Sequence, residues 1–307
     1  KIPARSRMTI KLSFDSICQG TFSDNLLFGL TNCRNDIYKL PVQGKCDYPE
    51  IDRSIQSLVP KIVNTFPKKH SITNVFVQKT EEFYMGSVLI VKERTRNGQA
   101  AYKASLNLLN NSEFTVETRS DLKLSGNKVP WVIENPTQKI PPGETGNIVI
   151  GFNPSSVDTF RNRLTVMVKD NPEPLYLDLI GEGCTPACEI STTSLDFDKL
   201  LPGMSRTLSF TIKNTGKLSA FWKMKGGNVL GNNFTLTATE GLLTEGSSVT
   251  VDIKYQAEKA FVAKKTIQID IFDVNKNRSF MSHHLNITAE TFDVLFDLIY
   301  PKGMDHL

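Results

Sequence analysis

Residues 138–154 read QKIPPGETGNIVIGFNP, and this stretch decides the fold. A Pro-Pro-Gly turn opens it, alternating apolar residues follow, and Phe152-Asn-Pro closes it. Ile148, Ile150 and Phe152 recur at every second position, the spacing that places side chains on one face of a β-strand. The stretch therefore predicts a turn followed by a strand with one buried face, on which Phe152 is a large aromatic anchor.

The same phrase occurs twice more in the chain. Residues 1–14 read KIPARSRMTIKLSF, and residues 242–255 read LLTEGSSVTVDIKY. Phe14 lies 138 residues before Phe152, Tyr255 lies 103 residues after it, and further apolar positions keep both offsets. Because self-similarity at a fixed offset indicates an array of like units, we expect Phe14 and Tyr255 to be core anchors as well.

The segments around these phrases also have the pattern of strands. KASLNLLNNSEF (103–114) aligns with TLSFTIKNTGKL (207–218), so that Asn110 lies over Asn214, and each strand ends in a polar turn. Residues 164–183 and 265–290 each contain two alternating runs joined by a turn. Units of about 100 residues with turns every 8–12 residues indicate Ig-like β-sandwiches. The expected fold class is all-β, with tandem Ig-like sandwiches joined by short stiff hinges.

The hinges divide the chain into units. GKCDYPEI (44–51) and GEGCTPACEI (181–190) both carry Gly, Cys and Pro before an acidic residue and Ile, and Pro stiffens such a passage. Within the next segment, IDRSIQSLV is predicted to form one short helix, and KERTRNGQA (92–100) is predicted to be a loop. We expect residues 1–50 to be the C-terminal half of an Ig-like unit, 51–82 a linker, 83–186 a unit with an insertion, 187–290 a further unit, and 291–307 the start of the next linker or domain.

The composition favours a protein without nucleic-acid or membrane partners. Of the 307 residues, 39% are hydrophobic and 22% are charged, and the net charge is only +4 with charges scattered along the chain. Nucleic-acid binding would need a clustered basic face, and no segment has the apolar length of a membrane span. An odd number of cysteines does not close a disulfide framework, so we expect reduced thiols and an intracellular location. The five are Cys18, Cys33, Cys46, Cys184 and Cys188.

No motif in the sequence proposes catalysis. His283 and His284 are adjacent in a predicted strand, so their side chains point to opposite faces and do not chelate one metal together. Cys184 and Cys188 lack the second pair that a zinc site requires. A nucleophile elbow, a dinucleotide-binding loop and a P-loop are all missing. We therefore expect no enzyme activity, no cofactor, no metal and no small-molecule substrate.

The motifs resemble a known family of domains. LDFDKLLPGMSRTLSFTIKNTGKL (195–218) is similar to the opening of an ASH/MSP-type domain, and residues 140–183 are similar to its closing half. Tandem units joined by GKCDYP-type hinges resemble the hydin-like family of the ciliary central apparatus. The copy at residues 242–255 departs from the pattern, since Tyr255-Gln-Ala stands in the Phe-x-Pro position. The resemblance implies a non-enzymatic scaffold on central-pair microtubules, in the axoneme of the cytoskeleton.

Two functions are compatible with this pattern. The first is a structural segment of a motile-cilium axoneme that binds tubulin or neighbouring axonemal proteins, and the alternative is an extracellular or cell-surface adhesion module. The unit that contains residues 138–154 is longer than the unit that contains residues 242–255 by about 35 residues, and this excess lies around residues 53–103. Such additions on a rigid scaffold often carry binding. Because tubulin is acidic, we expect the basic residues of this excess to be candidate contacts. They are Lys61, Lys68, Lys69, Lys92, Arg94 and Arg96.

Overall fold

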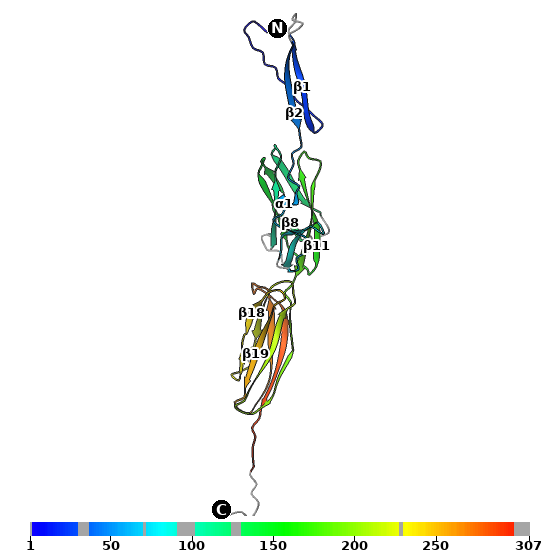
Figure 1. Cartoon of the computed structure of the whole chain (residues 1–307). Coiled ribbons are helices and arrows are strands. Elements are labelled where there is room, and N and C mark those ends of the chain that lie inside the picture. The colour runs from blue at the N-terminus through cyan, green and yellow to red at the C-terminus, as the bar shows by residue number, and fades with distance from the viewer. Residues whose placement is uncertain are drawn as a thin grey trace, which may run out of the picture.

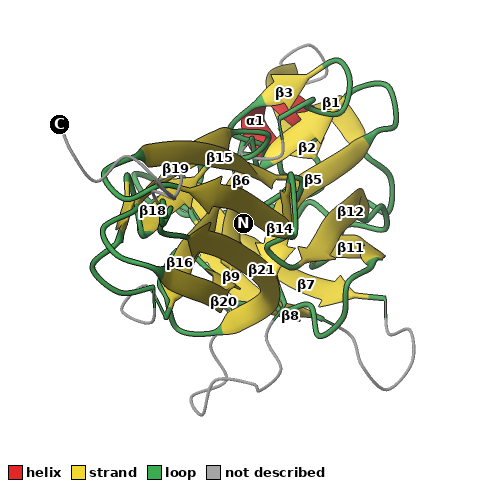
Figure 2. Cartoon of the chain, turned by 90° about the horizontal axis from the view of Figure 1, so that it is seen from below, coloured by secondary structure: helices red, strands yellow, loops and turns green. Residues whose placement is uncertain are grey.

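The computed structural model describes residues 2–29, 37–69, 72–90, 102–123, 130–226 and 230–297, and nearly all of the regular secondary structure in these ranges is β-strand. Three bodies follow one another, with the hairpin of β1 and β2 at one end and the sandwich that contains β18 and β19 at the other (Figure 1). We call them the hairpin (20–46), the middle sandwich (51–184) and the C-terminal sandwich (188–291). Viewed from below, one short helix is drawn among the strands, and it is the four-residue α1 (Ile55–Leu58) inside IDRSIQSLV (Figure 2). The predicted all-β fold class is confirmed.

The hairpin consists of β1 (Gly20–Gly29) and β2 (Ile37–Cys46), which pair antiparallel with Phe22 opposite Gly44. No residue of either strand is buried, and residues 2–19 form turns but no strand. Phe14 is 51% exposed and lies against Phe22, with ring centroids 5.6 Å apart. No second sheet covers this face within the described part of the chain, so Phe14 is exposed there, and its role as a core anchor stays a prediction.

The middle sandwich packs a three-stranded sheet against a seven-stranded sheet. In spatial order, the smaller sheet contains β6 (Tyr102–Leu109), β10 (Thr145–Phe152) and β8 (Trp131–Ile133). The larger sheet contains β3 (Ile62–Val63), β4 (Val75–Val77), β5 (Glu82–Leu89), β12 (Leu175–Cys184), β11 (Thr159–Val168), β7 (Val116–Leu122) and β9 (Thr137–Ile140).

Phe152 is the anchor of the middle core, as its sequence position predicts. It is 0% exposed, and its ring lies 4.4 Å from that of Trp131. A Cβ added to Gly181 would lie 2.7 Å from the Phe152 ring, so only glycine leaves room for the anchor at that position. In the hairpin, a Cβ added to Gly44 would meet Phe14 at 2.9 Å in the same way.

Residues 51–82 are part of the middle sandwich and not a linker, which corrects the prediction for this segment. Ile51, Leu58 and Phe76 are buried in the core between the two sheets. Strand β4 pairs antiparallel with β5, and β3 pairs parallel with β4, so the segment extends the larger sheet. Both faces of β4 are buried, which removes the alternation that would have marked it as a strand. The tract 92–100 lies outside the described residues.

The C-terminal sandwich has a four-stranded and a five-stranded sheet. The first contains β13 (Cys188–Ile190), β15 (Ser205–Asn214), β19 (Ser248–Gln256) and β17 (Phe234–Leu236). The second contains β14 (Ser194–Leu200), β21 (Ser279–Thr291), β20 (Phe261–Phe272), β16 (Ala220–Lys225) and β18 (Glu240–Leu243). Tyr255, which is 0% exposed, is the anchor of this core as predicted, and its ring lies 4.7 Å from that of Phe234.

The turn of the quoted phrase recurs with the same hydrogen bond in all three copies, before the hairpin and in each sandwich. The amide N–H donates three residues back, from Ser6 to Pro3 at 3.2 Å, from Glu144 to Pro141 at 3.2 Å, and from Ser247 to Thr244 at 3.1 Å. The residue before each donor has positive φ, at 60° for Arg5, 75° for Gly143 and 71° for Gly246. Glycine adopts this backbone freely, whereas Arg5 reaches it at a steric cost.

Each hinge is bound to the body that follows it. The Pro49 carbonyl accepts a hydrogen bond of 3.0 Å from Asn171 Nδ2, in the turn between β11 and β12. The Cys188 carbonyl lies 2.7 Å from His283 Nε2 on β21, and the Ala187 carbonyl accepts from the amides of Thr215 and Gly216. The hinge ends are therefore ordered by the next sandwich as well as by proline.

Candidate functional site

The structure describes three of the six predicted contact residues. Lys61, Lys68 and Lys69 are exposed. Lys61 immediately precedes the edge strand β3, and its carbonyl accepts a 2.8 Å hydrogen bond from the amide of Phe76. Lys69 instead borders a groove at the junction of the two sandwiches. Lys92, Arg94 and Arg96 lie outside the described residues.

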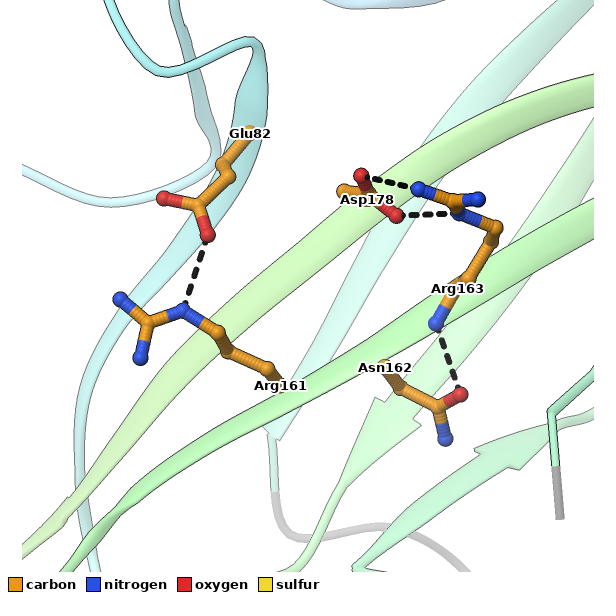
Figure 3. A network of polar contacts seen from close by, with 5 residues as sticks. All are labelled: Glu82, Arg161, Asn162, Arg163 and Asp178. Carbon is orange, nitrogen blue, oxygen red and sulfur yellow. Dashed lines mark hydrogen bonds and ion pairs between the residues drawn. The ribbon is translucent and has the colours of Figure 1, made fainter. Parts of the chain in front are cut away.

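The outer face of the seven-stranded sheet carries a network of ion pairs that the sequence analysis missed. Arg163 holds Asp178 in a two-point contact, with Nε 2.6 Å from Oδ1 and Nη2 2.8 Å from Oδ2 (Figure 3). The hydrogen bonds from Arg163 lower the pKa of the Asp178 carboxyl. Arg161 Nε lies 2.9 Å from Glu82 Oε1 on β5, so the network connects three neighbouring strands (Figure 3).

A second group of ion pairs lies toward the other edge of the same sheet. Glu117 accepts contacts from Lys139 at 2.7 Å and Lys169 at 3.6 Å, and its pKa is lowered first by the hydrogen bond from Lys139. We call the whole set the charged face. Its basic members are Arg119, Lys123, Lys139, Arg161, Arg163 and Lys169, and its acidic members are Glu82, Glu117, Asp121 and Asp178.

The charged face consists of rows of charged side chains on the solvent-facing side of the seven-stranded sheet. Its six basic and four acidic members leave a surplus of two positive charges. Exposed pairs of this kind contribute about 0–1 kcal/mol each to stability, so stability alone does not explain so many of them. Charges of both signs at fixed spacing suit recognition of a charged protein surface. The only sequence signal was the row of charged residues at the outward positions of residues 161–178, and their partners lie on strands distant in sequence.

The junction between the sandwiches contains a groove of about 660 Å³. Residues from both bodies line it, including Lys69, Ser87 and Leu89 from the middle sandwich and Lys217 and Val274 from the C-terminal sandwich. At its wall, Lys217 Nζ lies 2.9 Å from Glu182 Oε2, so an ion pair crosses the junction. The groove therefore depends on how the two sandwiches are held.

The thiols do not form a reactive or metal-binding site among the described residues. Cys18, Cys46, Cys184 and Cys188 are free. Burial raises the pKa of the Cys188 thiol to about 11 and also raises that of Cys184, so both stay protonated near neutral pH. No group of three or more His, Cys, Asp and Glu side chains in the described ranges could hold a metal ion. The described part of the chain also contains no helix long and apolar enough to cross a membrane.

The chain is similar to known proteins along nearly its whole length, although no family model matches it. It is 25% identical over 312 residues to the hydrocephalus-inducing protein of Mus musculus, covering 99% of this chain and 6% of that protein. It is also 25% identical over 314 residues to the Homo sapiens homolog, with the same coverage of 99% and 6%. The chain thus spans about 6% of the length of these curated relatives.

Further similarities are partial. The chain is 30% identical over 93 residues to the human protein named deleted in lung and esophageal cancer protein 1, which is 30% of this chain and 5% of that protein. Among solved structures, an ASH/PapD-like domain of human CEP192 is 15% identical and covers 35% of this chain and 87% of its own, with a TM-score of 0.31. SSP-19, an MSP-domain protein of Caenorhabditis elegans, is 12% identical and covers 33% of this chain and 97% of its own, with a TM-score of 0.28. The hydin-like resemblance read from the motifs is confirmed by the two hydrocephalus-inducing proteins.

Proposed function

We propose that this chain is a non-enzymatic structural segment of a hydin-like scaffold in the axoneme of a motile cilium, in the central apparatus. The observation that carries the proposal is the similarity to hydrocephalus-inducing protein, which covers 99% of the chain and so includes its hinges as well as its sandwiches. A similarity confined to one sandwich would indicate only a shared fold. Shared hinges indicate a shared arrangement of units.

The architecture supports a scaffold. The bodies follow one another, and each sandwich has its own hydrophobic core (Figure 1). Hydrogen bonds from Asn171 and His283 hold the hinges to the body that follows. Such a chain fixes where each unit lies along its length, and its broad sheet faces are available to bind neighbouring proteins.

The proposed partner surface lies on the middle sandwich. It consists of the six predicted basic residues between positions 61 and 96 together with the charged face. Its partner would be the acidic surface of tubulin or of another axonemal protein. Long-range attraction between such surfaces weakens with salt, because the Debye length falls to about 8 Å at physiological ionic strength. Binding should therefore be strongest at low salt.

Microtubule co-sedimentation tests this partner. Charge reversal of Lys68, Lys69, Arg94 and Arg96 to Glu should lower the pelleted fraction at low salt, while the melting temperature stays unchanged. The matched control reverses four lysines of the C-terminal sandwich, Lys254, Lys259, Lys264 and Lys265, and should pellet like wild type. Equal pelleting of wild type and both variants would remove tubulin as an electrostatic partner of these residues. An equal loss of pelleting in both variants would mean that net charge, and not the position of these residues, determines binding.

We also propose that the hairpin is the closing half of a further sandwich. Its Phe22–Gly44 pairing matches Phe160–Gly181 in β11 and β12. Phe14 lies on Gly44 as Phe152 lies on Gly181. In a longer chain that includes the opening half, the backbone amides of β1 and β2 should exchange with solvent more slowly than in this chain. Equal exchange rates would contradict the proposal.

A further inference from the structure

An ion pair connects the middle sandwich to the C-terminal sandwich. Glu182, on the last strand of the middle sandwich, is 19% exposed, and its Oε2 lies 2.9 Å from Nζ of Lys217. The same oxygen accepts a 2.8 Å hydrogen bond from Ser87 Oγ, and the Tyr84 hydroxyl lies 3.4 Å away. The carboxylate is therefore held in place by its own sandwich and presented to the lysine of the next one.

The position of Glu182 has an equivalent in the hairpin. Thr159 pairs with Glu182 in β11 and β12, and Thr21 pairs with Lys45 in β1 and β2. Thr21 lies 138 residues before Thr159, which is the offset of the repeat. Lys45 is thus the equivalent of Glu182, with the opposite charge.

The position of Lys217 also has an equivalent. Asn214 donates from Nδ2 to the Leu218 carbonyl at 2.9 Å, and Asn110 donates from Nδ2 to the Phe114 carbonyl at 2.8 Å. The residue before each acceptor is Lys217 in the C-terminal sandwich and Glu113 in the middle sandwich. The second partner of the junction has therefore changed sign as well.

At the first junction, the direct partner of Lys45 is an aspartate of the hinge. Lys45 Nζ lies 3.2 Å from Asp47 in the hinge. The hydrogen bond to Asp47 raises the pKa of Lys45 most, and the Coulomb attraction of Glu113 raises it further. The first junction thus places lysine on the preceding body and glutamate on the following one, and the second junction places them in the reverse order.

We infer that the end face of each body selects the body that follows it by the sign of one charge at a fixed position. The middle sandwich holds Glu182 2.9 Å from Lys217, and Lys45 and Glu113 occupy the equivalent positions at the first junction with the charges exchanged. A body placed out of order would bring Lys45 to Lys217, or Glu182 to Glu113, and like charges at such a site oppose docking. Each end face therefore fits a unit of this array that carries the opposite charge at the facing position. This inference depends on the junction geometry and not on the ciliary function.

Charge exchange at the second junction tests the inference in the whole chain. The variants are Glu182→Lys, Lys217→Glu and the double variant E182K/K217E, which recreates the charge order of the first junction. Glu182→Gln is a milder variant that keeps an acceptor for Ser87 while removing the charge. Spin labels on exposed Thr137 and Ser248, each changed to cysteine with Cys18, Cys33 and Cys46 replaced by serine, report the distance between the sandwiches by pulsed electron resonance.

The double variant is the decisive measurement. Each single reversal should broaden the distance distribution and shift it to longer distances, Glu182→Gln should broaden it less, and the double variant should restore the wild-type distribution. Arg163→Glu, which breaks an ion pair within the middle sandwich, should leave the distribution unchanged. A distribution that stays the same in Glu182→Lys would overturn the inference, and so would a double variant as broad as the single reversals. Melting curves of each variant identify any loss of folding.

Discussion

At the scale of single residues, a buried asparagine fixes the same corner in both sandwiches. Asn110 and Asn214 are both 0% exposed. Asn214 Nδ2 donates to the carbonyls of Leu218 at 2.9 Å and Leu243 at 3.0 Å, and its Oδ1 accepts from the amide of Gly216 at 2.9 Å. The side chain thus ties the end of β15 to the end of β18. The sequence predicted a polar turn here but not the burial, because both positions read as ordinary loop residues.

Substitution of this asparagine should be costly although it lies in a turn. Asn214→Ala leaves one buried carbonyl (Leu243), one part-buried carbonyl (Leu218) and one part-buried amide (Gly216) without their partner, and a fully buried group of this kind costs about 1–3 kcal/mol. Asn214→Asp should be worse at neutral pH, because a carboxylate would face the carbonyl oxygens that the amide now serves. Urea denaturation should show the loss in the C-terminal sandwich, and Asn110→Ala should show the same loss in the middle one. Ser247→Ala, at an exposed hydroxyl nearby, serves as the control.

The aromatic anchors predict a contrast within one repeated phrase. Phe152→Ala and Tyr255→Ala each remove a fully buried ring, and the cost for such a residue is about 3–5 kcal/mol. Phe14→Ala, at the equivalent position in the hairpin, should leave both sandwich transitions unchanged, because Phe14 is 51% exposed. Thermal melting measures all three. Unchanged melting in Phe152→Ala would mean that the inward and outward faces of β10 are reversed.

At the scale of elements, the two sandwiches differ at one sheet edge. β5 and β14 are equivalent, since each runs parallel to the last strand of its sandwich with a register shift. On the outer face beside β5, Tyr84 and Ile180 are buried with Val75 and Val77 of β4. On the outer face beside β14, the corresponding contact is a 2.9 Å hydrogen bond from Thr288 Oγ1 to Asp196. The apolar pair requires the cover that β4 provides, and the polar pair does not.

Strand β4 should therefore be essential to the middle sandwich. Val77→Asp would place a charge at a site that is 0% exposed, and an unpaired buried charge costs on the order of 3 kcal/mol or more. We expect the transition of the middle sandwich to shift to lower temperature, while that of the C-terminal sandwich stays in place. Val77→Ile, which keeps the apolar surface, is the matched control. If Val77→Asp melted like wild type, residues 51–82 would be a linker after all.

The repeated phrase contained enough information to predict the turns, the anchors and the paired strands of each unit. Its spacing is local, and local spacing is what periodicity reports. Strands β3 and β4 escaped prediction because three consecutive residues, Val75, Phe76 and Val77, are all buried. The charged face escaped because its contacts join distant segments, such as Arg161 to Glu82 across 79 positions. Side-chain pairing of this kind depends on strand order, which the sequence pattern does not contain.

At the scale of the whole molecule, the cores of the two sandwiches share no residue. Each sandwich should therefore fold on its own local contacts, and their coupling passes through the hinge and the pair of Glu182 and Lys217. The two transitions invoked above follow from this separation. The few contacts at the hinge and the ion pair thus determine how the units are placed, whereas the core of each unit determines its stability.

The parallel pairing of β14 with β21 has a consequence for how the chain responds to a pull on its ends. Tension enters the C-terminal sandwich at the hinge, reaches β14 once the three-residue β13 has separated from β15, and leaves the sandwich at the end of β21. Because the two strands run side by side in the same direction, the pull slides one along the other and loads their hydrogen bonds all at once. Strands pulled apart from one end would instead lose their bonds one by one. The C-terminal sandwich is thus arranged to resist stretching, and in the middle sandwich β3 and β4 would have to detach before β5 and β12 bear the load.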